Sequence, residues 1–386
     1  MSALSPQSDS SGAAPAPSAP PAQGGPGSSS RRGFLQMAAA GVAGLLTTAG
    51  AAGSARADTP VSSAPPSRTR TLRVAYITDV HLQPERRAAE GFAECLRHIH
   101  SQPDKPNLVL GGGDFIMDGF AATRERTKTQ WDLWTRVLKD EMNLPLRTCL
   151  GNHDIWGWNQ EKSGANGSET DYGKKWAMDV LGQPGRYHAF TQGGWRFVAL
   201  DSIQPGEKPG TYVSYLDEEQ RNWLKEELLH TPPTMPVLIW SHAPLISALL
   251  QLTEKRATPF TSGTVQPNLV HSDGGELSKL FAGHPNVKLC LSGHLHMVEG
   301  LELRDVMYRC AGSVCGNWWR GPRDGFAEGY SMLDLYDDGS HTCTYVPFGW
   351  KAETDLPAVP VPAPVPASPT PAPAQNVPPA AGAKVG

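Results

Sequence analysis

The sequence has little of what would direct it to nucleic acid, to a membrane or to thiolate chemistry. Its formal net charge is only -4 over 386 residues, which gives no electrostatic reason to expect nucleic acid or an anionic membrane as the bulk partner. The uncharged run over residues 37–53 is too short and too rich in alanine and glycine for a confident membrane span. The six cysteines include no Cys-x-x-Cys pair. We therefore expect no nucleic-acid binding, no stable membrane anchor and no thiolate metal site.

The first 57 residues read as an export segment. Residues 1–29 are mostly Ser, Pro, Ala and Gly and are expected to be disordered. Arg31-Arg32, Phe34-Leu35, the apolar run and Ala55-Arg56-Ala57 then follow in an order that resembles a twin-arginine signal peptide. This resemblance implies the twin-arginine export machinery as a partner, cleavage after Ala57 and a periplasmic or secreted product. An uncleaved anchor helix is the alternative, and the four glycines in the run disfavour it.

The remainder divides into a linker, one domain and a tail. Residues 58–70 are a Pro/Ser/Arg linker, and residues 352–386 are a Pro/Ala-rich run that should be disordered or extended. Residues 71–351 contain no obvious internal linker or repeat, so we treat them as one domain.

Apolar runs alternate with helical patterns inside this domain. Helical spacing is expected over residues 86–100, 121–141 and 217–230, and residues 155–185 read as a long loop with one helix. Strands are expected at residues 72–77, 107–110, 145–150, 187–190, 195–200, 237–240, 287–291, 298–303, 307–311, 331–336 and 341–346. This order predicts a mixed α/β fold with an antiparallel C-terminal portion.

Five of the expected strands run directly into polar residues that can bind metals. The residues concerned are Asp79 and His81, Asp114, Asn152 and His153, His242, and His294 and His296. The ends of strands in an α/β sheet bring distant parts of the chain to one crevice. Carboxylate and neutral imidazole bind divalent first-row metals, and one carboxylate can bridge two ions. Each i, i+2 pair should point to the same side of its strand, which suits chelation.

In order, these blocks resemble the calcineurin-like metallophosphoesterase superfamily, in particular its bacterial phosphodiesterase-like branch, from Val74 to about Cys310. The resemblance implies a four-layer α/β/β/α sandwich of two mixed β-sheets flanked by helices. It also implies two divalent or mixed-valence metal ions, for which Zn, Mn and Fe are all suitable. The first ion would have the ligands Asp79, His81, Asp114 and His296. The second would have Asp114, Asn152, His242 and His294, with Asp114 as the bridge.

The resemblance also implies a mechanism in which a metal-bridging hydroxide attacks the phosphorus in line, without a covalent enzyme intermediate. His153 would act as the general acid, and Asp154 would orient His153 or another imidazole. Two positions depart from common relatives. Met117 stands where iron-tyrosinate phosphatases carry a tyrosine, which argues against a purple Fe(III) site, and Asp118 is one residue too late to be a metal ligand.

Trp318, Trp319 and Arg320 could return to the mouth of this site and contact substrate. An indole can stack on a base or sugar, and a guanidinium can pair with phosphate. The alternative is that both tryptophans serve packing. Cys149 and Cys290 are expected to be buried free thiols, whereas an oxidising periplasm would permit Cys310, Cys315 or Cys343 to pair.

The function expected from the sequence is an exported hydrolase of phosphodiesters, such as cyclic nucleotides or nucleotide-derived diesters. A broad phosphomonoesterase or a pyrophosphatase is the alternative within enzymes. A catalytically silent binding scaffold of the same fold is the alternative outside them. Each motif alone has an ordinary structural explanation, but the ordered set favours the two-metal site.

Overall fold

The computed structural model describes residues 68–251 and 267–353. The expected signal peptide, nearly all of the linker and nearly all of the Pro/Ala-rich tail lie outside these residues. None of the helices in the described part is long and apolar enough to cross a membrane.

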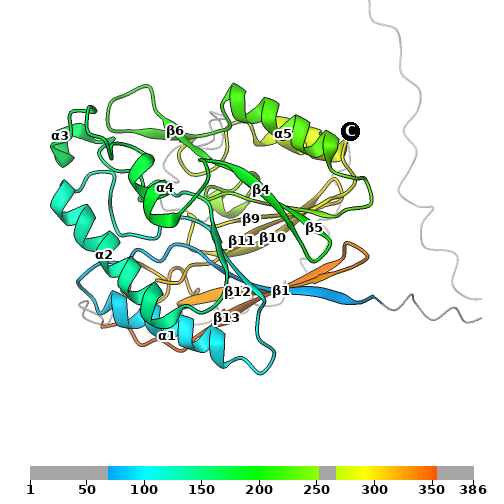
Figure 1. The fold of residues 1–386 in the computed structure, drawn as a ribbon, viewed down its shortest axis with the longest axis horizontal. Helices are drawn as coiled ribbons and strands as arrows, with labels where there is room; N and C mark the ends of the chain where they lie inside the picture. The colour runs from blue at the N-terminus through cyan, green and yellow to red at the C-terminus, as the bar shows by residue number, and fades with distance from the viewer. Residues whose placement is uncertain (1–67, 252–266, 354–386) are drawn as a thin grey trace, which may run out of the picture. The chain divides into compact units, whose positions relative to one another are not determined.

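The first large sheet has the strand order β13-β12-β1-β2-β3. Figure 1 shows β13, β12 and β1 next to one another. The three strands β1, β2 and β3 run parallel, whereas β12 and β13 are antiparallel to their neighbours. The strands are β1 (Arg70–Ile77), β2 (Leu108–Gly111), β3 (Leu146–Thr148), β12 (Gly329–Tyr336) and β13 (His341–Pro347). The sheet therefore joins the two ends of the described chain.

The second large sheet has the order β10-β11-β9-β8-β5-β4. Its four central strands are parallel, and β4 and β10 are antiparallel edge strands. They are β4 (His188–Gln192), β5 (Trp195–Ala199), β8 (Val237–Trp240), β9 (Val287–Ser292), β10 (Val298–Leu303) and β11 (Val306–Ala311). A separate two-stranded hairpin consists of β6 (Ile203–Pro205) and β7 (Tyr212–Ser214).

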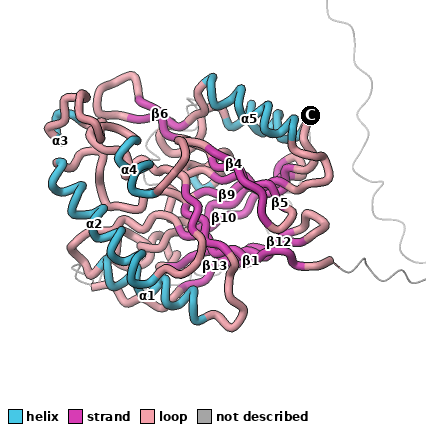
Figure 2. Tube along the Cα trace, in the orientation of Figure 1, coloured by secondary structure: helices cyan, strands magenta, loops and turns pink. Residues whose placement is uncertain are grey.

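Helices cover the outer faces of both large sheets (Figure 2). Those packed on the first sheet are α1 (Ala88–Ser101) and α2 (Arg124–Glu141), and those packed on the second are α5 (Glu218–His230) and α6 (Gly274–Ala282). Shorter elements are α3 (Gln160–Ser163), α4 (Lys175–Leu181) and the 3-10 turn η1 (Leu249–Gln251). Thr123 and Asp217 cap α2 and α5, because each side chain accepts a backbone N–H from the first turn.

Successive side chains of β1 point to opposite faces of the first sheet and so fill two different layers of the core. Val74 and Tyr76 belong to the apolar cluster between the two sheets, while Ala75 and Ile77 belong to the cluster under α1 and α2. All four are fully buried, and burying a side chain such as that of Val74 or Ile77 stabilises the fold by about 1.5–3 kcal/mol. The expected four-layer α/β/β/α sandwich is confirmed.

Three elements differ from the expectation. Helix α6 was not expected, because its start at Gly274-Gly275 has low helix propensity. It forms because Leu277 and Phe281 pack on the second sheet. Residues 155–185 contain two short helices instead of one, and the β6–β7 hairpin was not expected from its short strands.

Trp319 belongs to the core. Its side chain is fully buried, and its Nε1–H donates to the carbonyl of Val80 at 2.9 Å. A Cβ on Gly91 would lie 2.3 Å from its ring, so α1 can approach only because residue 91 is glycine. The structure thus gives Trp319 the packing role, and the residue has no exposed surface to offer a substrate.

We expect Trp319→Ala to lower the free energy of unfolding by about 3–5 kcal/mol, because it leaves a large cavity under α1. Trp318→Ala is the matched control, since that side chain is only half-buried and its loss should cost much less. Urea unfolding followed by circular dichroism measures both. Equal losses would contradict the different placement of the two indoles.

Candidate metal centre

The predicted ligands lie where parallel strands of both large sheets end. Asp79 and His81 follow β1, Asp114 follows β2, and Asn152 follows β3. His242 follows β8, and His294 and His296 follow β9 in the other sheet. Because all these are carboxyl ends, the two sheets direct their ligands to one edge of the sandwich.

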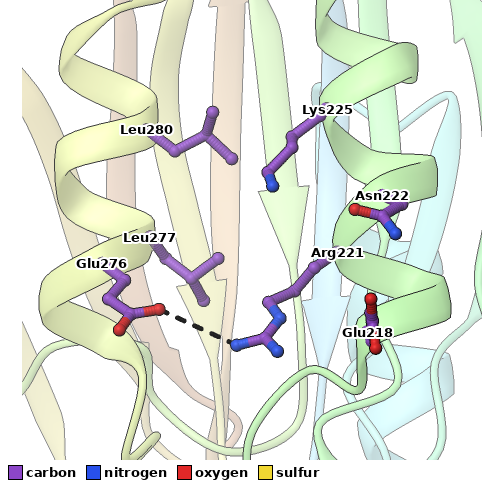
Figure 3. Close-up of a pocket in the computed structure, with 7 residues that line it drawn as sticks. All are labelled: Glu218, Arg221, Asn222, Lys225, Glu276, Leu277 and Leu280. Carbon is purple, nitrogen blue, oxygen red and sulfur yellow. Dashed lines mark ion pairs between the residues drawn. The ribbon is translucent and has the colours of Figure 1, made fainter.

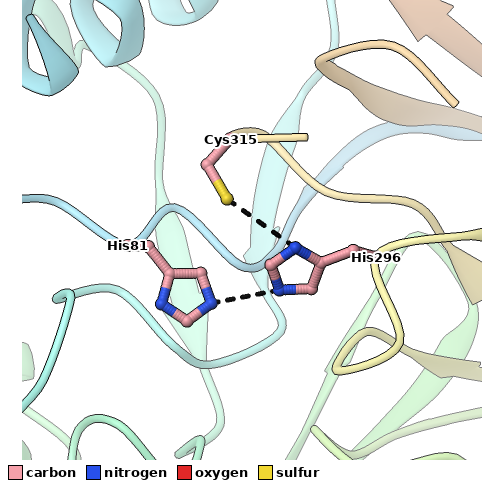
Figure 4. Close-up of side chains that lie close together, drawn as sticks. All are labelled: His81, His296 and Cys315. Atoms are coloured by element: carbon pink, nitrogen blue, oxygen red, sulfur yellow. Dashed lines mark hydrogen bonds between the residues drawn. The ribbon is translucent and has the colours of Figure 1, made fainter. Parts of the chain in front are cut away.

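One group of ligands consists of Asp79, His81 and His296. Nε2 of His81 lies 3.1 Å from Nε2 of His296, and the same His296 atom lies 3.3 Å from Oδ1 of Asp79. The three side chains are at most 3% exposed. Figure 4 shows the two imidazoles facing each other through these nitrogens. Two buried imidazole nitrogens at this distance need a shared proton or a cation between them.

A second group consists of Asn152, His242 and His294. Nε2 of His242 lies 3.2 Å from Oδ1 of Asn152 and 3.1 Å from Nδ1 of His294. His294 and His296 therefore belong to different groups, although they are two residues apart.

Asp114 lies between the two groups. Its Oδ2 is 3.1 Å from Nε2 of His242 and 3.6 Å from Nε2 of His81. Its Oδ1 accepts the backbone N–H of His153 at 2.8 Å. Oxygen and nitrogen donors of this kind fit divalent first-row metals. The residues present therefore fit a metal centre in which Asp114 is shared.

The outer nitrogens of three imidazoles face backbone carbonyls. Nδ1 of His242 donates to Gly112 at 2.8 Å, Nε2 of His294 to Asn268 at 2.8 Å, and Nδ1 of His296 to Gly316 at 2.6 Å. Because a carbonyl can only accept, the proton is fixed on the outer nitrogen and the lone pair of the other nitrogen points inward. For His81, no described residue is a partner of Nδ1.

Strand alternation does not bring these ligands together. Five of them have positive φ: Asp79, His81, Asp114, His294 and His296. For residues other than glycine this conformation is uncommon and costs about 1 kcal/mol or more each. The i, i+2 argument from the sequence is therefore wrong in its geometry, because β1 ends at Ile77 and β9 at Ser292. The left-handed backbone conformation of these five residues, in the turns after the strands, directs their side chains toward one another.

Gly151 is needed for close approach. A Cβ on Gly151 would lie 2.1 Å from Oδ1 of Asp114, and one on Gly293 would lie 2.2 Å from Oδ2 of Asp79. Gly151 has no positive φ, so its role is to leave room for the shared carboxylate.

Asp154 has partners other than those expected. Its carboxylate accepts the backbone N–H groups of Gly151, Asp114 and Phe115 at 2.8–2.9 Å. It thereby joins the turn after β3 to the turn after β2, and no imidazole in the described part of the chain is hydrogen-bonded to it. Burial and the charge of Asp114 raise the pKa of Asp154 to about 7, while the backbone donors act in the opposite direction.

His153 is oriented by Met117. Its Nδ1 donates to the Met117 carbonyl at 2.5 Å, and its ring meets that of His81 edge-on at 4.7 Å. A ring nitrogen of His153 lies within 4.8 Å of ligand atoms of His81 and Asp114. The side chain is half-buried, so it sits beside the ligands and remains within reach of a bound molecule.

The negative charges of Asp79 and Asp114 stabilise positive charge at the candidate metal site. Burial acts to lower the pKa of His242, but the Asp114 carboxylate outweighs it and raises that pKa to about 9. In the metal-free protein, protonated His242 therefore contributes stability below pH 6.5, and this is lost as pH rises through about 9. A metal ion bound at Nε2 would displace that proton.

Cys315 lies next to the candidate metal site, a contact that the sequence did not indicate. Its Sγ lies 3.8 Å from Nδ1 of His296, on the side away from His81 (Figure 4). The thiol therefore contacts the outer nitrogen of His296 and not Nε2, the nitrogen that faces the other candidate ligands. All six cysteines are free in the structure, and Cys149 and Cys290 are buried thiols as expected. No motif spacing connects Cys315 with His296, so only the fold could reveal this contact.

Of the three residues expected to contact substrate, Trp318 lies beside the first ligand group and Arg320 is exposed at the surface. The Trp318 ring is 4.7 Å from that of His296 and 5.9 Å from that of His81, and the Arg323 guanidinium lies 5.4 Å from its centre. Trp318 therefore borders the first ligand group.

A hollow between α5 and α6 is separate from these ligands (Figure 3). Glu218, Arg221 and Lys225 line it from α5 and Glu276 lines it from α6, and Arg221 pairs with Glu276 at 3.7 Å. Cations and carboxylates balance there, so the hollow has no charge that would select a phosphate.

The sequence profile of the calcineurin-like phosphoesterase family matches residues 72–298. The chain belongs to this family. The metallophosphoesterase motifs predicted from the sequence thus lie in a metallophosphoesterase fold whose family uses divalent metals.

Relatives of this calcineurin-like phosphoesterase include cyclic nucleotide phosphodiesterases. A probable cyclic nucleotide phosphodiesterase of Synechococcus is 29% identical over 70% of this chain and 90% of its own length. A 3′,5′-cyclic adenosine monophosphate phosphodiesterase of Pseudomonas aeruginosa is 23% identical, with 71% and 89% covered. The crystal structure of a dimetal phosphatase from Danio rerio is similar with a TM-score of 0.50 at 16% identity, covering 72% of this chain and 96% of that one.

We expect Gly151→Ala to displace Asp114 and to remove most of the bound metal, because the new methyl group cannot fit beside the carboxylate. Gly275→Ala is the control: that position is exposed in α6, with open space around its Cβ. Elemental analysis of both purified variants, with circular dichroism to verify folding, measures the effect. Full metal content in a folded Gly151→Ala protein would contradict the role of the glycine.

Proposed function

We propose that this metallophosphoesterase is a dinuclear hydrolase of phosphodiesters, with cyclic nucleotides or nucleotide-derived diesters as its substrates. One observation carries the proposal: two ligand groups share the Asp114 carboxylate and His153 stands beside them. The cyclic nucleotide phosphodiesterases among the relatives support the choice of a diester. When bound, the metal ions would supply Lewis-acid stabilisation of phosphoryl charge and an activated water.

The chain's own residues would orient and protonate the substrate. The Met117 carbonyl holds one proton on Nδ1 of His153, which leaves Nε2 to face the substrate. As a general acid the ring would act in its doubly protonated form, with the proton on Nε2 passing to the leaving oxygen. The Asp114 carboxylate fixes the backbone of His153 through its N–H. The general acid and the shared ligand are therefore held at a constant separation, which is the condition for proton transfer in a positioned complex.

Asp114→Asn and His153→Ala should each remove most activity on bis(p-nitrophenyl) phosphate, but only Asp114→Asn should lower the metal content. Replacing a shared carboxylate weakens both ligand groups, whereas His153 acts on the substrate. His230→Ala, an exposed histidine on α5, is the control and should behave as the wild type. Unchanged turnover in both site variants would overturn the mechanism.

The substrate class is tested by comparing the turnover of four substrates by the metal-loaded wild-type protein. A phosphodiesterase should hydrolyse 3′,5′-cyclic AMP and bis(p-nitrophenyl) phosphate faster than p-nitrophenyl phosphate and pyrophosphate. The reverse order would favour the monoesterase or pyrophosphatase alternative, and no turnover of any of them by metal-loaded protein would favour a binding scaffold.

We also propose that the protein is exported through the twin-arginine route, on the basis of Arg31-Arg32 and the Ala55-Arg56-Ala57 site. Export in the folded state suits a protein that must acquire buried metal ions. N-terminal sequencing of the exported protein should begin at Asp58. Abolition of export by Arg31→Lys with Arg32→Lys supports the route, whereas export with Met1 retained would contradict cleavage.

A further inference from the structure

Phe120, Tyr212 and Trp158 form an aromatic wall beside the second ligand group. The rings of Phe120 and Tyr212 are 5.6 Å apart, and those of Phe120 and Trp158 are 6.1 Å apart. Tyr212 in β7 in turn lies 6.3 Å from the ring of His294. All three aromatic side chains are half-buried.

The wall is fixed to the loop that contains His153. The carbonyl of His153 accepts the N–H of Gly119 at 2.7 Å, and the carbonyl of Phe120 accepts the N–H of Asn159 at 3.0 Å. Since Met117 orients the His153 ring, one short segment holds both the proposed general acid and the Phe120 ring. A molecule placed for protonation by His153 would therefore lie within reach of the aromatic wall.

The aromatic side chains of the wall are partly exposed, and their contacts with one another do not cover every ring face. The three contacts among Trp158, Phe120, Tyr212 and His294 are all edge-to-face, with interplanar angles of 70–75°. Such a contact covers one face of one ring. Phe120 and Tyr212 together have four faces, so at least one is not covered by another of these rings. Trp318, by contrast, contacts His296, His81 and Arg323.

The wall is suited to an uncharged planar group. The cation at its edge, Lys174, lies 5.4 Å from the centre of the Trp158 ring but is paired with Asp201 at 2.6 Å. Ile155, Ile203 and Ala243 pack against Trp158 and Tyr212, and Ala243 directly follows the candidate ligand His242. An aromatic surface without net charge stacks a nucleobase better than it binds a second phosphate.

We propose that Phe120 and Tyr212 are specificity-determining residues that stack the base of a nucleotide substrate next to the second ligand group. The inference rests on the proposed phosphodiesterase function and extends it. It places the base beside β7 and His294, whereas Trp318 contacts His296 and His81 of the first ligand group. Tyr212 also neighbours Asn268, whose backbone carbonyl accepts the Nε2–H of His294. Tyr212 could therefore also act by positioning that ligand, and the test separates the two roles.

The test measures binding of 5′-AMP and of methyl phosphate to the manganese-loaded protein by isothermal titration calorimetry. The wild type should bind 5′-AMP about tenfold more tightly than methyl phosphate, as expected for one stacked base. Phe120→Leu and Tyr212→Leu should remove this advantage and leave methyl phosphate binding within about twofold. Tyr212→Phe keeps the ring and should retain it. Tyr187→Leu, whose ring packs on Trp223, is the control and should bind both ligands as the wild type does.

Two results would overturn the inference: equal affinity of the wild type for the two ligands, or variants that lose both ligands equally. Loss of metal from Tyr212→Leu and Tyr212→Phe alike would show a positioning role instead of stacking. The outcomes are distinct from failure of the proposed function. That failure would appear as no hydrolysis of cyclic AMP by a protein that still prefers 5′-AMP, whereas cyclic AMP hydrolysis with no effect of the variants on binding would overturn the stacking alone.

Discussion

The shared position of the Asp114 carboxylate is the constraint on which the rest of the site depends. One oxygen faces histidines from both sheets, and the other accepts the N–H of His153. A buried carboxylate among buried imidazoles is stable only with compensating charge. The surrounding structure supplies room for that arrangement through Gly151 and rigidity through the backbone bonds of Asp154. The centre is thus built by backbone geometry as much as by its ligands.

The segment after β2 would link the proposed chemistry to the proposed contact with the base. It contains Asp114, the Met117 carbonyl that orients His153, and the Phe120 ring. Asp154 holds the start of this segment by accepting two of its N–H groups. A change in the segment would therefore alter metal binding, proton transfer and contact with the substrate together. Exchange of the half-buried Phe120 ring alone would change only the contact with the substrate.

Both the layers and the ligand order could be predicted from the sequence, because each depends on local patterns. Alternating burial in β1 and apolar runs such as that of β8 are visible as strings of residues. The candidate metal ligands follow strand ends, as expected from the sequence. Helix α6 and the β6–β7 hairpin were not predictable in this way, because tertiary packing and not propensity determines them.

The sequence by itself determined the fold class, the order of the ligand blocks and the family, since these follow from residue type, spacing and position after strands. Tertiary structure alone decided which of two neighbouring tryptophans is core and which borders the site. It also decided that Asp154 holds backbone and not an imidazole, and that left-handed turns aim the ligands. The physical reason is that hydrogen-bond partners and ring contacts join residues far apart in the chain, and no local pattern specifies which of them will meet.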